Sequence, residues 1–392
     1  MASKRRATAE LMVRSFLDPR LPKSTRAPGI SVDSLTKEAR MAGGPVGQNA
    51  EDSPGPVRMP VRLGTGGPTG AGVSRLLAQL RQSAFQGRKL GEAFDVWKRM
   101  IDGGSLICLG LAGSMSSAGM WPLVTWLVER GYVDLIASTS ANVTEDLLEQ
   151  RGVSFYQVDP DHVDDEALLA KGFYRFYDHV VSAAEYDRME DLTGEFFDDL
   201  AGSWPRPTIA GVRFMREFGR WLDGRGLRGS IAAACYRHRV PLFVPAAPDG
   251  PLSEGYRTAR RKGPIVDFFR DYEIVLRIMS RYMVPGRAKD FIQITATSVS
   301  ALRGAADASP HLAAIQITTD NTVFGGLSGA GVGTECISWG KESPTGWNVM
   351  VFADFTIALP LLCQGLLEHY GPAHARAARA GIVAEVTALL DD

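Results

Sequence analysis

The heptapeptide ECISWGK, Glu335–Lys341, closes a long glycine-rich stretch, and Lys341 is its chemical centre. A lysine flanked by Trp339 and Glu335 can lose solvation, lower its pKa and act as a neutral amine nucleophile. The indole offers an apolar wall and a face for a cationic substrate, which the Glu335 carboxylate could anchor. The competing interpretation is an ordinary loop lysine with Trp339 as packing. The stretch therefore predicts a site for covalent amine chemistry, with that alternative open.

The four residues Ser338–Lys341, SWGK, resemble the active-site signature of the deoxyhypusine synthase family, in which this lysine forms a covalent imine with the substrate. Four further segments resemble the same family in order and spacing: 105–119 (SLICLGLAGSMSSAG), 133–146 (VDLIASTSANVTED), 241–252 (PLFVPAAPDGPL) and 349–360 (VMVFADFTIALP). The resemblance spans roughly residues 73–370. It implies that family's fold over most of the chain.

The composition argues against several other classes of protein. The 392 residues, 45% hydrophobic and 22% charged, suit a soluble globular protein with a large core. A formal net charge of −1 argues against nucleic acid as the main partner. No apolar run reaches ~18 residues, so no membrane span is predicted. The basic N-terminus lacks a following apolar region, so no secretory signal is predicted. The four cysteines form no C-x-x-C pair, which fits free thiols in the cytoplasm.

The chain divides near residue 72. Residues 1–40 carry nine Lys and Arg against four Asp and Glu, and residues 41–72 contain nine Gly and five Pro. Such a stretch cannot bury enough apolar surface to fold alone, so we expect 1–72 to be a mobile arm. It is either a solvated tail or an arm packed over a neighbouring subunit. Residues 73–392 are predicted to form the catalytic domain.

Apolar runs of strand length alternate with helical stretches from Val73 onward. Helical spacing first appears between Leu76 and Trp97, with a break near Gln86-Gly87. Buried strands are predicted at 106–109, 133–137, 242–244, 291–294, 312–317 and 349–352, and helices at 122–130, 211–222, 265–282, 356–368 and 373–391. This alternation predicts an α/β fold with a doubly wound, mostly parallel sheet, Rossmann-like in arrangement.

Ligands of such sheets bind at the carboxyl ends of the strands, and polar loops follow several predicted strands. The turn containing Gly113, Ser114, Ser116 and Ser117 is small and rich in donors, which suits a pyrophosphate. The resemblance implies NAD as cofactor. It assigns these residues to the cofactor: Ser114, Ser116, Ser117, Thr139, Ser140, Ala141, Asp249, Thr319, Ala353 and Asp354. Asp354 could equally be a helix N-cap, since Thr356 follows it.

The resemblance also implies the residues that face an amine substrate, namely Glu145, Glu254, Glu335 and Trp339. Glu254 stands where the family has an aspartate, and a solvated loop charge is its alternative. We expect Asp146 to be an exposed charge at a helix start. No cluster has metal-ligand spacing, so no metal site is predicted.

Two features depart from the family pattern. The stretch Thr295–Leu302, TATSVSAL, lacks the histidine that the family carries there as a base on the substrate amine. Acidic residues of the family are also missing from Asn321–Gly333, where Gly325, Gly326, Leu327 and Ser328 stand. The loss removes negative charge from a pocket built for a polycation. It favours a donor that carries fewer positive charges than spermidine, or one that binds in a different register.

These observations lead to three functional hypotheses. The first is an NAD-dependent transferase that moves an aminobutyl-type group from an amine or polyamine donor to a small amine acceptor through a Lys341 imine, as in homospermidine synthesis. The second is deoxyhypusine synthase itself, acting on an initiation-factor lysine. The third is a catalytically weak NAD-binding paralogue that serves as a subunit. The resemblance further implies a homotetramer.

Overall fold

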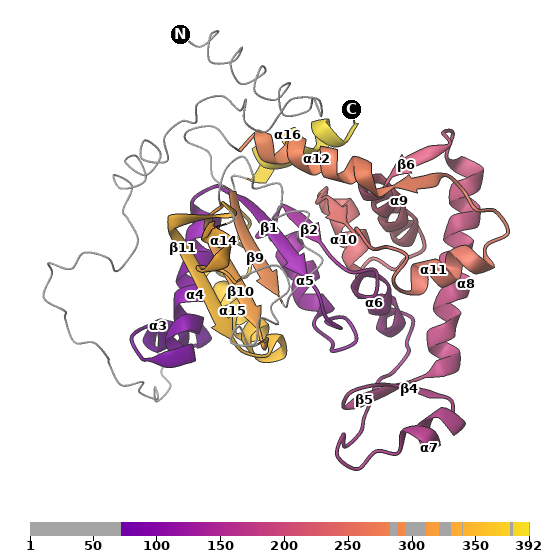
Figure 1. Cartoon of the computed structure of the whole chain (residues 1–392), viewed down its shortest axis with the longest axis horizontal. Coiled ribbons are helices and arrows are strands. Elements are labelled where there is room, and N and C mark those ends of the chain that lie inside the picture. The colour runs from indigo at the N-terminus through magenta and orange to yellow at the C-terminus, as the bar shows by residue number, and fades with distance from the viewer. Residues whose placement is uncertain are drawn as a thin grey trace, which may run out of the picture.

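The structure is a computed structural model, and it describes residues 72–282, 289–294, 311–320, 331–338, 340–376 and 379–391. The predicted arm lies outside the described residues apart from Gly72. The described ranges alternate strands and helices around one six-stranded sheet (Figure 1).

The six-stranded sheet contains every strand that the sequence predicts. Its members are β1 (Leu106–Leu111), β2 (Leu135–Ala137), β7 (Leu242–Phe243), β9 (Lys289–Ile294), β10 (His311–Thr318) and β11 (Glu342–Phe352). They lie in the order β11-β10-β9-β1-β2-β7, and each neighbouring pair is parallel. The chain thus winds outward from β1 in one direction and from β9 in the other, which confirms the doubly wound prediction. The topological switch point lies between β1 and β9, where such folds bind ligands.

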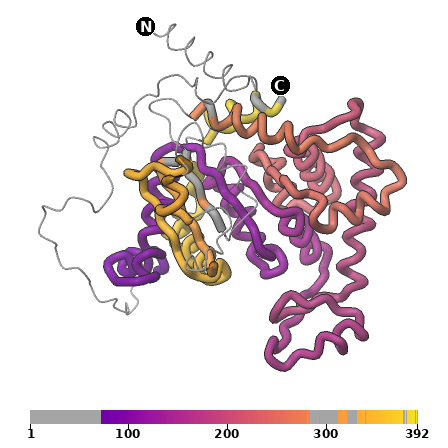
Figure 2. The backbone as a smooth tube through the Cα atoms, viewed as in Figure 1, coloured from indigo at the N-terminus to yellow at the C-terminus, as the bar shows by residue number. Residues whose placement is uncertain are grey.

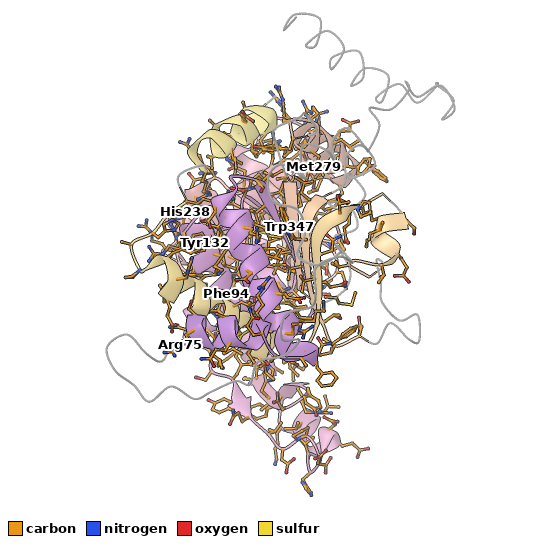
Figure 3. All side chains as sticks on the ribbon, turned by 90° about the vertical axis from the view of Figure 1, so that its left-hand side faces the viewer. Arg75, Phe94, Tyr132, His238, Met279 and Trp347 are labelled. Carbon is orange, nitrogen blue, oxygen red and sulfur yellow. The ribbon has the colours of Figure 1, made fainter. Side chains whose placement is uncertain are left out.

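Helices cover both faces of this sheet because its side chains alternate between two apolar clusters. In β1, Ile107, Leu109 and Leu111 enter the larger cluster, whereas Leu106 and Cys108 enter the smaller one. The larger cluster is covered by α4 (Phe85–Asp102), α5 (Trp121–Glu129) and α15 (Phe355–Tyr370), and the smaller by α12 (Phe268–Ser280) and α16 (Arg379–Asp391). Figure 3 labels Phe94 and Tyr132 in the larger cluster and Met279 in the smaller. In Figure 2 the purple segment that contains β1 and β2 lies beside the orange segment that contains β10 and β11.

Several boundaries differ from the predictions. The predicted helix 265–282 begins as a short strand, β8 (Ile265–Asp267), which pairs with β6 (Thr208–Ala210). Helix α12 begins only at Phe268, because Asp267 is its N-cap and accepts from the Arg270 N–H at 3.1 Å. The terminal helix begins at Arg379, and the break after α3 (Val73–Arg81) lies at residues 82–84. All three differences are set by local capping and pairing that apolar spacing does not encode.

The region between β2 and β7 holds elements that the sequence did not predict. It contains α6 (Asn142–Gln150), α8 (Ala183–Ser203), α9 (Gly211–Gly224) and α10 (Ile231–His238), of which only α9 was predicted. A small antiparallel sheet of β3 (Tyr156–Gln157), β4 (Phe173–Phe176) and β5 (His179–Ser182), with α7 (Asp165–Ala170), lies at the far end of α8 (Figure 1). After β7 comes α11 (Pro251–Thr258), and α14 (Glu335–Ser338) precedes β11.

A buried ion pair holds the C-terminal segment to the amino edge of the sheet. The Arg376 guanidinium pairs with the Asp134 carboxylate just before β2, and both side chains are almost fully buried. Arg376 also donates to the Ser105 carbonyl at 3.0 Å, and the Asp134 carboxylate accepts from the Ile107 N–H at 2.8 Å.

In the part of the chain that the structure describes, no helix is long and apolar enough to cross a membrane.

Candidate active site

The turn after β1 is fixed by a side chain from the neighbouring loop. The Asn142 Oδ1 accepts from the N–H groups of Met115 and Ser116 at 3.0 and 3.3 Å, and the Ser116 hydroxyl donates to the Asn142 carbonyl at 2.5 Å. Asn142 is completely buried, so these bonds are shielded from water. They leave Ser114 exposed at the carboxyl edge next to Gly113, whose φ is +72°. The serine turn is therefore rigid at its base and open at its tip.

The loops after β2 and β7 are joined in the same way. The Ser140 hydroxyl donates to the Asp249 backbone carbonyl, and a Cβ on Gly250 would lie 2.4 Å from the Ser140 Oγ. Only glycine permits this approach, and its φ of +145° also favours glycine. Thr139 and Ala141 are half-buried beside Ser140, and the Asp249 side chain is exposed. Three of the predicted cofactor loops thus meet at one edge of the sheet.

Glu145 lies beneath these loops on the first turn of α6. Its side chain is only 4% exposed, and its Oε1 accepts from the Tyr186 hydroxyl of α8 at 3.2 Å. Among the described residues no side chain or backbone group makes a hydrogen bond of good geometry to its Oε2, and the nearby Ser117 N–H acts on the carboxylate only as a weak donor. Burial raises the pKa of Glu145 to about 7, while the Tyr186 hydroxyl and the Ser117 N–H act in the opposite direction. A carboxylate with this pKa can exchange a proton near neutral pH.

The prediction that Asp146 is exposed is wrong. Asp146 is fully buried, and its Oδ2 accepts from the Ile231 N–H at the start of α10, at 2.6 Å. Burial raises its pKa to about 7, and the neighbouring Glu145 charge contributes in the same direction. Asp146 therefore ties α6 to the N-terminus of α10, where a carboxylate is favoured by the helix dipole.

Glu254 is engaged by another residue of the chain. Its carboxylate pairs with the Arg257 Nε at 2.7 Å, and the same guanidinium reaches Glu190 of α8 at 3.0 Å. Glu254 and Arg257 are 48% and 67% exposed, so both lie on the rim. Tyr186 and Glu190 are four residues apart on α8, on one face of that helix. Glu145 and Glu254 thus lie along the same side of α8, and the Glu254 carboxylate is paired with Arg257.

Three predicted cofactor residues lie at the carboxyl ends of β10 and β11. Thr319 follows β10 and is exposed, and the Ala353 N–H donates to the Thr318 carbonyl at 3.0 Å. Asp354 is the N-cap of α15, because its Oδ1 accepts from the N–H of Thr356 at 2.7 Å. The N-cap interpretation of Asp354 is therefore confirmed. These residues share the carboxyl edge with the serine turn.

Lys341 lies at the opposite edge of the sheet. It directly precedes β11, whose first residue, Glu342, pairs with His311 at the start of β10. The eight residues of β10 separate this amino edge from the cofactor loops by about 23 Å at ~3.3 Å per residue. Glu335 is exposed in the same segment and accepts from the Gly331 N–H at 2.7 Å. Trp339, Thr295–Leu302 and residues 321–330 lie outside the described residues.

Comparison with known proteins shows which family the chain belongs to. Residues 75–366 match the family model for deoxyhypusine synthase. The chain is 35% identical over 296 residues to "Probable deoxyhypusine synthase 2" of Archaeoglobus fulgidus, a match that covers 74% of this chain and 96% of the relative. The chain belongs to the deoxyhypusine synthase family. The Methanosarcina acetivorans protein of the same name is 34% identical over 307 residues, which cover 76% of this chain and 87% of that protein.

Other relatives carry a different name, and a solved structure supports the fold. A "Deoxyhypusine synthase-like protein" of Elusimicrobium minutum is 30% identical over 293 residues, covering 71% of this chain and 76% of that protein. A crystal structure of an Entamoeba histolytica protein, described as a "putative deoxyhypusine synthase", superposes with a TM-score of 0.51 and 15% identity. That superposition covers 78% of this chain and 95% of the other, and confirms the predicted fold.

Sequence reasoning missed four residues of the candidate site, three at the carboxyl edge of the sheet and one at the amino edge. Asn142 fixes the serine turn, Tyr186 contacts Glu145, and Arg257 engages Glu254. Glu342, next to Lys341, is buried and accepts from the Gly333 N–H at 2.7 Å. Asn142 could have been suspected, because it follows the second strand within the cofactor-like loop. Tyr186 and Glu342 are fixed by contacts with other segments, and the pairing of Arg257 with its i+3 neighbour Glu254 depends on the direction of both side chains.

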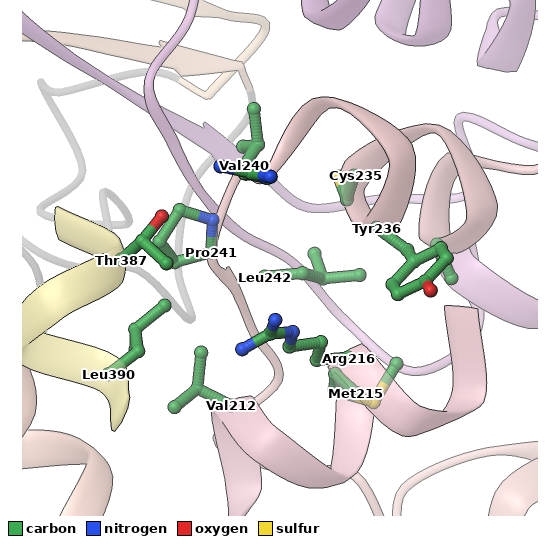
Figure 4. Close-up of a pocket in the computed structure, with 12 residues that line it drawn as sticks. Val212, Met215, Arg216, Cys235, Tyr236, Val240, Pro241, Leu242, Thr387 and Leu390 are labelled. Carbon is green, nitrogen blue, oxygen red and sulfur yellow. The ribbon is translucent and has the colours of Figure 1, made fainter. Parts of the chain in front are cut away.

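The described residues contain no cluster of three or more His, Cys, Asp or Glu side chains that could hold a metal ion. A small cavity of about 30 Å³ lies between α9, α10, the start of β7 and α16 (Figure 4). Val212, Cys235 and Leu390 line it, and its volume suits one water molecule. An open hollow of about 310 Å³ lies beside α7. Both lie away from the carboxyl edge, so neither belongs to the candidate site.

Proposed function

We propose that this member of the deoxyhypusine synthase family is an NAD-dependent aminoalkyl transferase. It moves an aminobutyl-type group from an amine donor to a small amine acceptor, as in homospermidine synthesis. The proposal rests chiefly on one observation, the engagement of Glu254 by Arg257, which lowers the number of carboxylates open to a polyamine. Transfer to a protein lysine is the second candidate, supported by the names of the archaeal relatives.

The carboxyl edge has the features that a dinucleotide needs. The exposed tip at Gly113 and Ser114 offers backbone and hydroxyl donors before α5, and the buried Asn142 holds it in place. Thr139–Ala141 and Asp249 form the adjacent wall, and Thr319, Ala353 and Asp354 extend it past the switch point. We assign NAD to this edge. Bound NAD would accept a hydride from the carbon beside the donor amine and later return it.

Lys341 supplies the covalent step. Its unprotonated amine attacks the oxidised donor, releases one amine fragment and holds the aminoalkyl group as an imine. An acceptor amine then displaces Lys341 and leaves with the group. Glu335 and Trp339 lie within the same seven residues and are assigned to the substrate cation. Residues 73–392 form this catalytic unit, with 1–72 as its arm.

The separation of Lys341 from the NAD edge supports a site shared between subunits. Within one chain a strand length and several strand spacings lie between Lys341 and Glu145. A two-fold dimer can bring the amino edge of one subunit to the carboxyl edge of its partner. We therefore propose a homo-oligomer, a tetramer built from such dimers, acting in a reducing cytoplasm that suits its four buried cysteines.

The proposed function is tested with a panel of amines. We expect the full-length protein, incubated with NAD and paired donors and acceptors, to give a new secondary amine, read by mass spectrometry. Diamine donors should give a higher kcat/KM than triamines, because each ammonium that enters a buried site needs a carboxylate partner. A preference for spermidine together with modification of an initiation-factor lysine would favour the second candidate.

Arg257 should control the selectivity between donors. Arg257→Ala frees Glu254 and Glu190 for a distal ammonium, so KM for a triamine should fall by about two- to fivefold while KM for a diamine stays unchanged. Arg260→Ala removes an exposed positive charge three residues away and is the matched control. An equal fall in KM for both variants would mean that general electrostatics, and not release of Glu254, is responsible.

A further inference from the structure

Glu145 combines three features that the binding of a cation does not require. It is almost fully buried, its Oε2 has no hydrogen-bond partner among the described residues, and its Oε1 is held by a phenol at 3.2 Å. The unpartnered oxygen lies on the α6 turn that follows the Thr139–Ala141 loop, at the edge assigned to NAD. A buried carboxylate oxygen without a partner is unfavourable unless a ligand completes it.

The proposed reaction needs a base at this position. An amine donor is an ammonium ion near neutral pH, and it cannot release a hydride until it loses a proton. None of the histidine side chains within the described ranges contacts Glu145, and Lys341 is assigned to the later imine-forming step. Glu145 is therefore the ionisable group best placed to receive that proton.

We infer that Glu145 is the general base of the oxidation step and that Tyr186 positions it. The Glu145 carboxylate takes one proton from the donor ammonium and becomes a neutral acid, while the donor becomes a free amine. Bound NAD would accept the hydride from the adjacent carbon, and the donor would become an iminium ion for Lys341 to attack. Charge and electrons balance, with one proton on Glu145 and two electrons on the cofactor. This inference rests on the proposed function.

The surroundings of Glu145 keep its carboxyl near the required pKa. Burial raises the pKa to about 7, and the Tyr186 hydroxyl limits the rise because it stabilises the charged form. Asp146 follows on α6, Asp187 and Tyr174 lie beside Tyr186, and α10 presents Cys235 to Asp146. Burial and the Glu145 charge both raise the pKa of Tyr186, so its hydroxyl remains a donor throughout the working range.

The test compares Tyr186→Phe with wild type in the full-length enzyme. Removal of the phenol hydroxyl withdraws a bond from the charged carboxylate, so the pKa of Glu145 should rise. The acid limb of kcat/KM should move to higher pH by about one unit. Tyr174→Phe is the matched control, because the Tyr174 ring lies 5.6 Å from that of Tyr186 while its hydroxyl donates to Asp187. This control should leave the limb in place.

A second readout does not depend on turnover. Infrared titration, taken as the difference between wild type and Glu145→Gln, should isolate one carboxyl C=O band near pH 7 from that of Asp146, whose pKa is also about 7. The same band should persist in Asp146→Asn and move upward in Tyr186→Phe. Glu145→Gln should also lower kcat by about 10²- to 10⁴-fold. If Glu145 titrates near 7 but the acid limb of kcat/KM ignores both Glu145→Gln and Tyr186→Phe, the base assignment is overturned and the proposed function stands. If no amine is turned over, the proposed function fails. The titration then still shows whether the Tyr186 hydroxyl stabilises the charged form of Glu145.

Discussion

Lys341→Ala should abolish turnover, with a loss in kcat of at least about 10⁴-fold. The expected loss is large because no other group in the proposed site can form the imine. NAD binding should be unchanged, since none of the residues assigned to the cofactor belongs to the Glu335–Lys341 segment. Calorimetry with NAD and steady-state kinetics with the preferred amine pair measure the two quantities separately.

Lys341→Arg is the informative companion to this variant. Arginine keeps the positive charge but cannot lose its proton, so it cannot attack the donor. We expect Lys341→Arg to be as inactive as Lys341→Ala. Lys262→Ala, which removes an exposed lysine that caps the end of α11, should retain full activity. Substantial turnover by either Lys341 variant would mean that the group passes directly from donor to acceptor.

Mixed oligomers of two inactive variants should recover activity. In a dimer of one Lys341→Ala chain and one Glu145→Gln chain, a shared site receives Glu145 from the first and Lys341 from the second. Random co-assembly should therefore restore about one quarter of wild-type activity, because half of the dimers are mixed and one of their two sites is intact. The kcat per chain is measured on the unselected co-expressed mixture, and pull-down through two affinity tags verifies that mixed species form; mixed dimers isolated in this way should reach about one half of wild-type activity.

The control for this experiment pairs two defects on the same side of the site. Co-expression of Glu145→Gln with Tyr186→Phe should give no gain above the average of the separate oligomers, because both residues lie in one chain at 3.2 Å. If the Lys341→Ala and Glu145→Gln mixture also stays inactive although mixed oligomers form, the active site is contained within one subunit. The chain must then bring its two edges together by folding the loops over the sheet.

The sheet could be predicted from the sequence because buried parallel strands read as continuous apolar runs. Residues 106–111 illustrate this, since Ile107 and Cys108 face opposite clusters and neither face is polar. The small sheet β3–β5 could not be predicted in the same way. Its strands have only two to four residues, and only Val180 and Val181 in them are buried, so they carry little apolar signal. Helix α12 was predicted three residues early because Ile265 and Val266 fit apolar spacing but pair as a strand.

The candidate site was predictable where it depends on loops that follow strands. Ser116, Ser140 and Asp249 meet at one edge, as expected for parallel strands. Burial was not predictable from a single sequence. Asp146 fits a helix start equally well whether it faces solvent or the Ile231 N–H, and only the packing of α10 decides. The same limit applies to Glu254, because its i+3 neighbour Arg257 could equally have pointed into solvent.

The central claim is that the aminoalkyl group passes through a covalent bond to Lys341, and borohydride trapping tests it most directly. The full-length enzyme is incubated with NAD and its preferred donor, without acceptor, then reduced and digested for peptide mass spectrometry. We predict a mass increase equal to the reduced aminoalkyl group on the peptide containing Lys341, dependent on NAD and absent from Lys341→Arg. A catalytically competent enzyme whose Lys341 peptide stays unmodified, or whose adduct lies on another residue, would contradict the account.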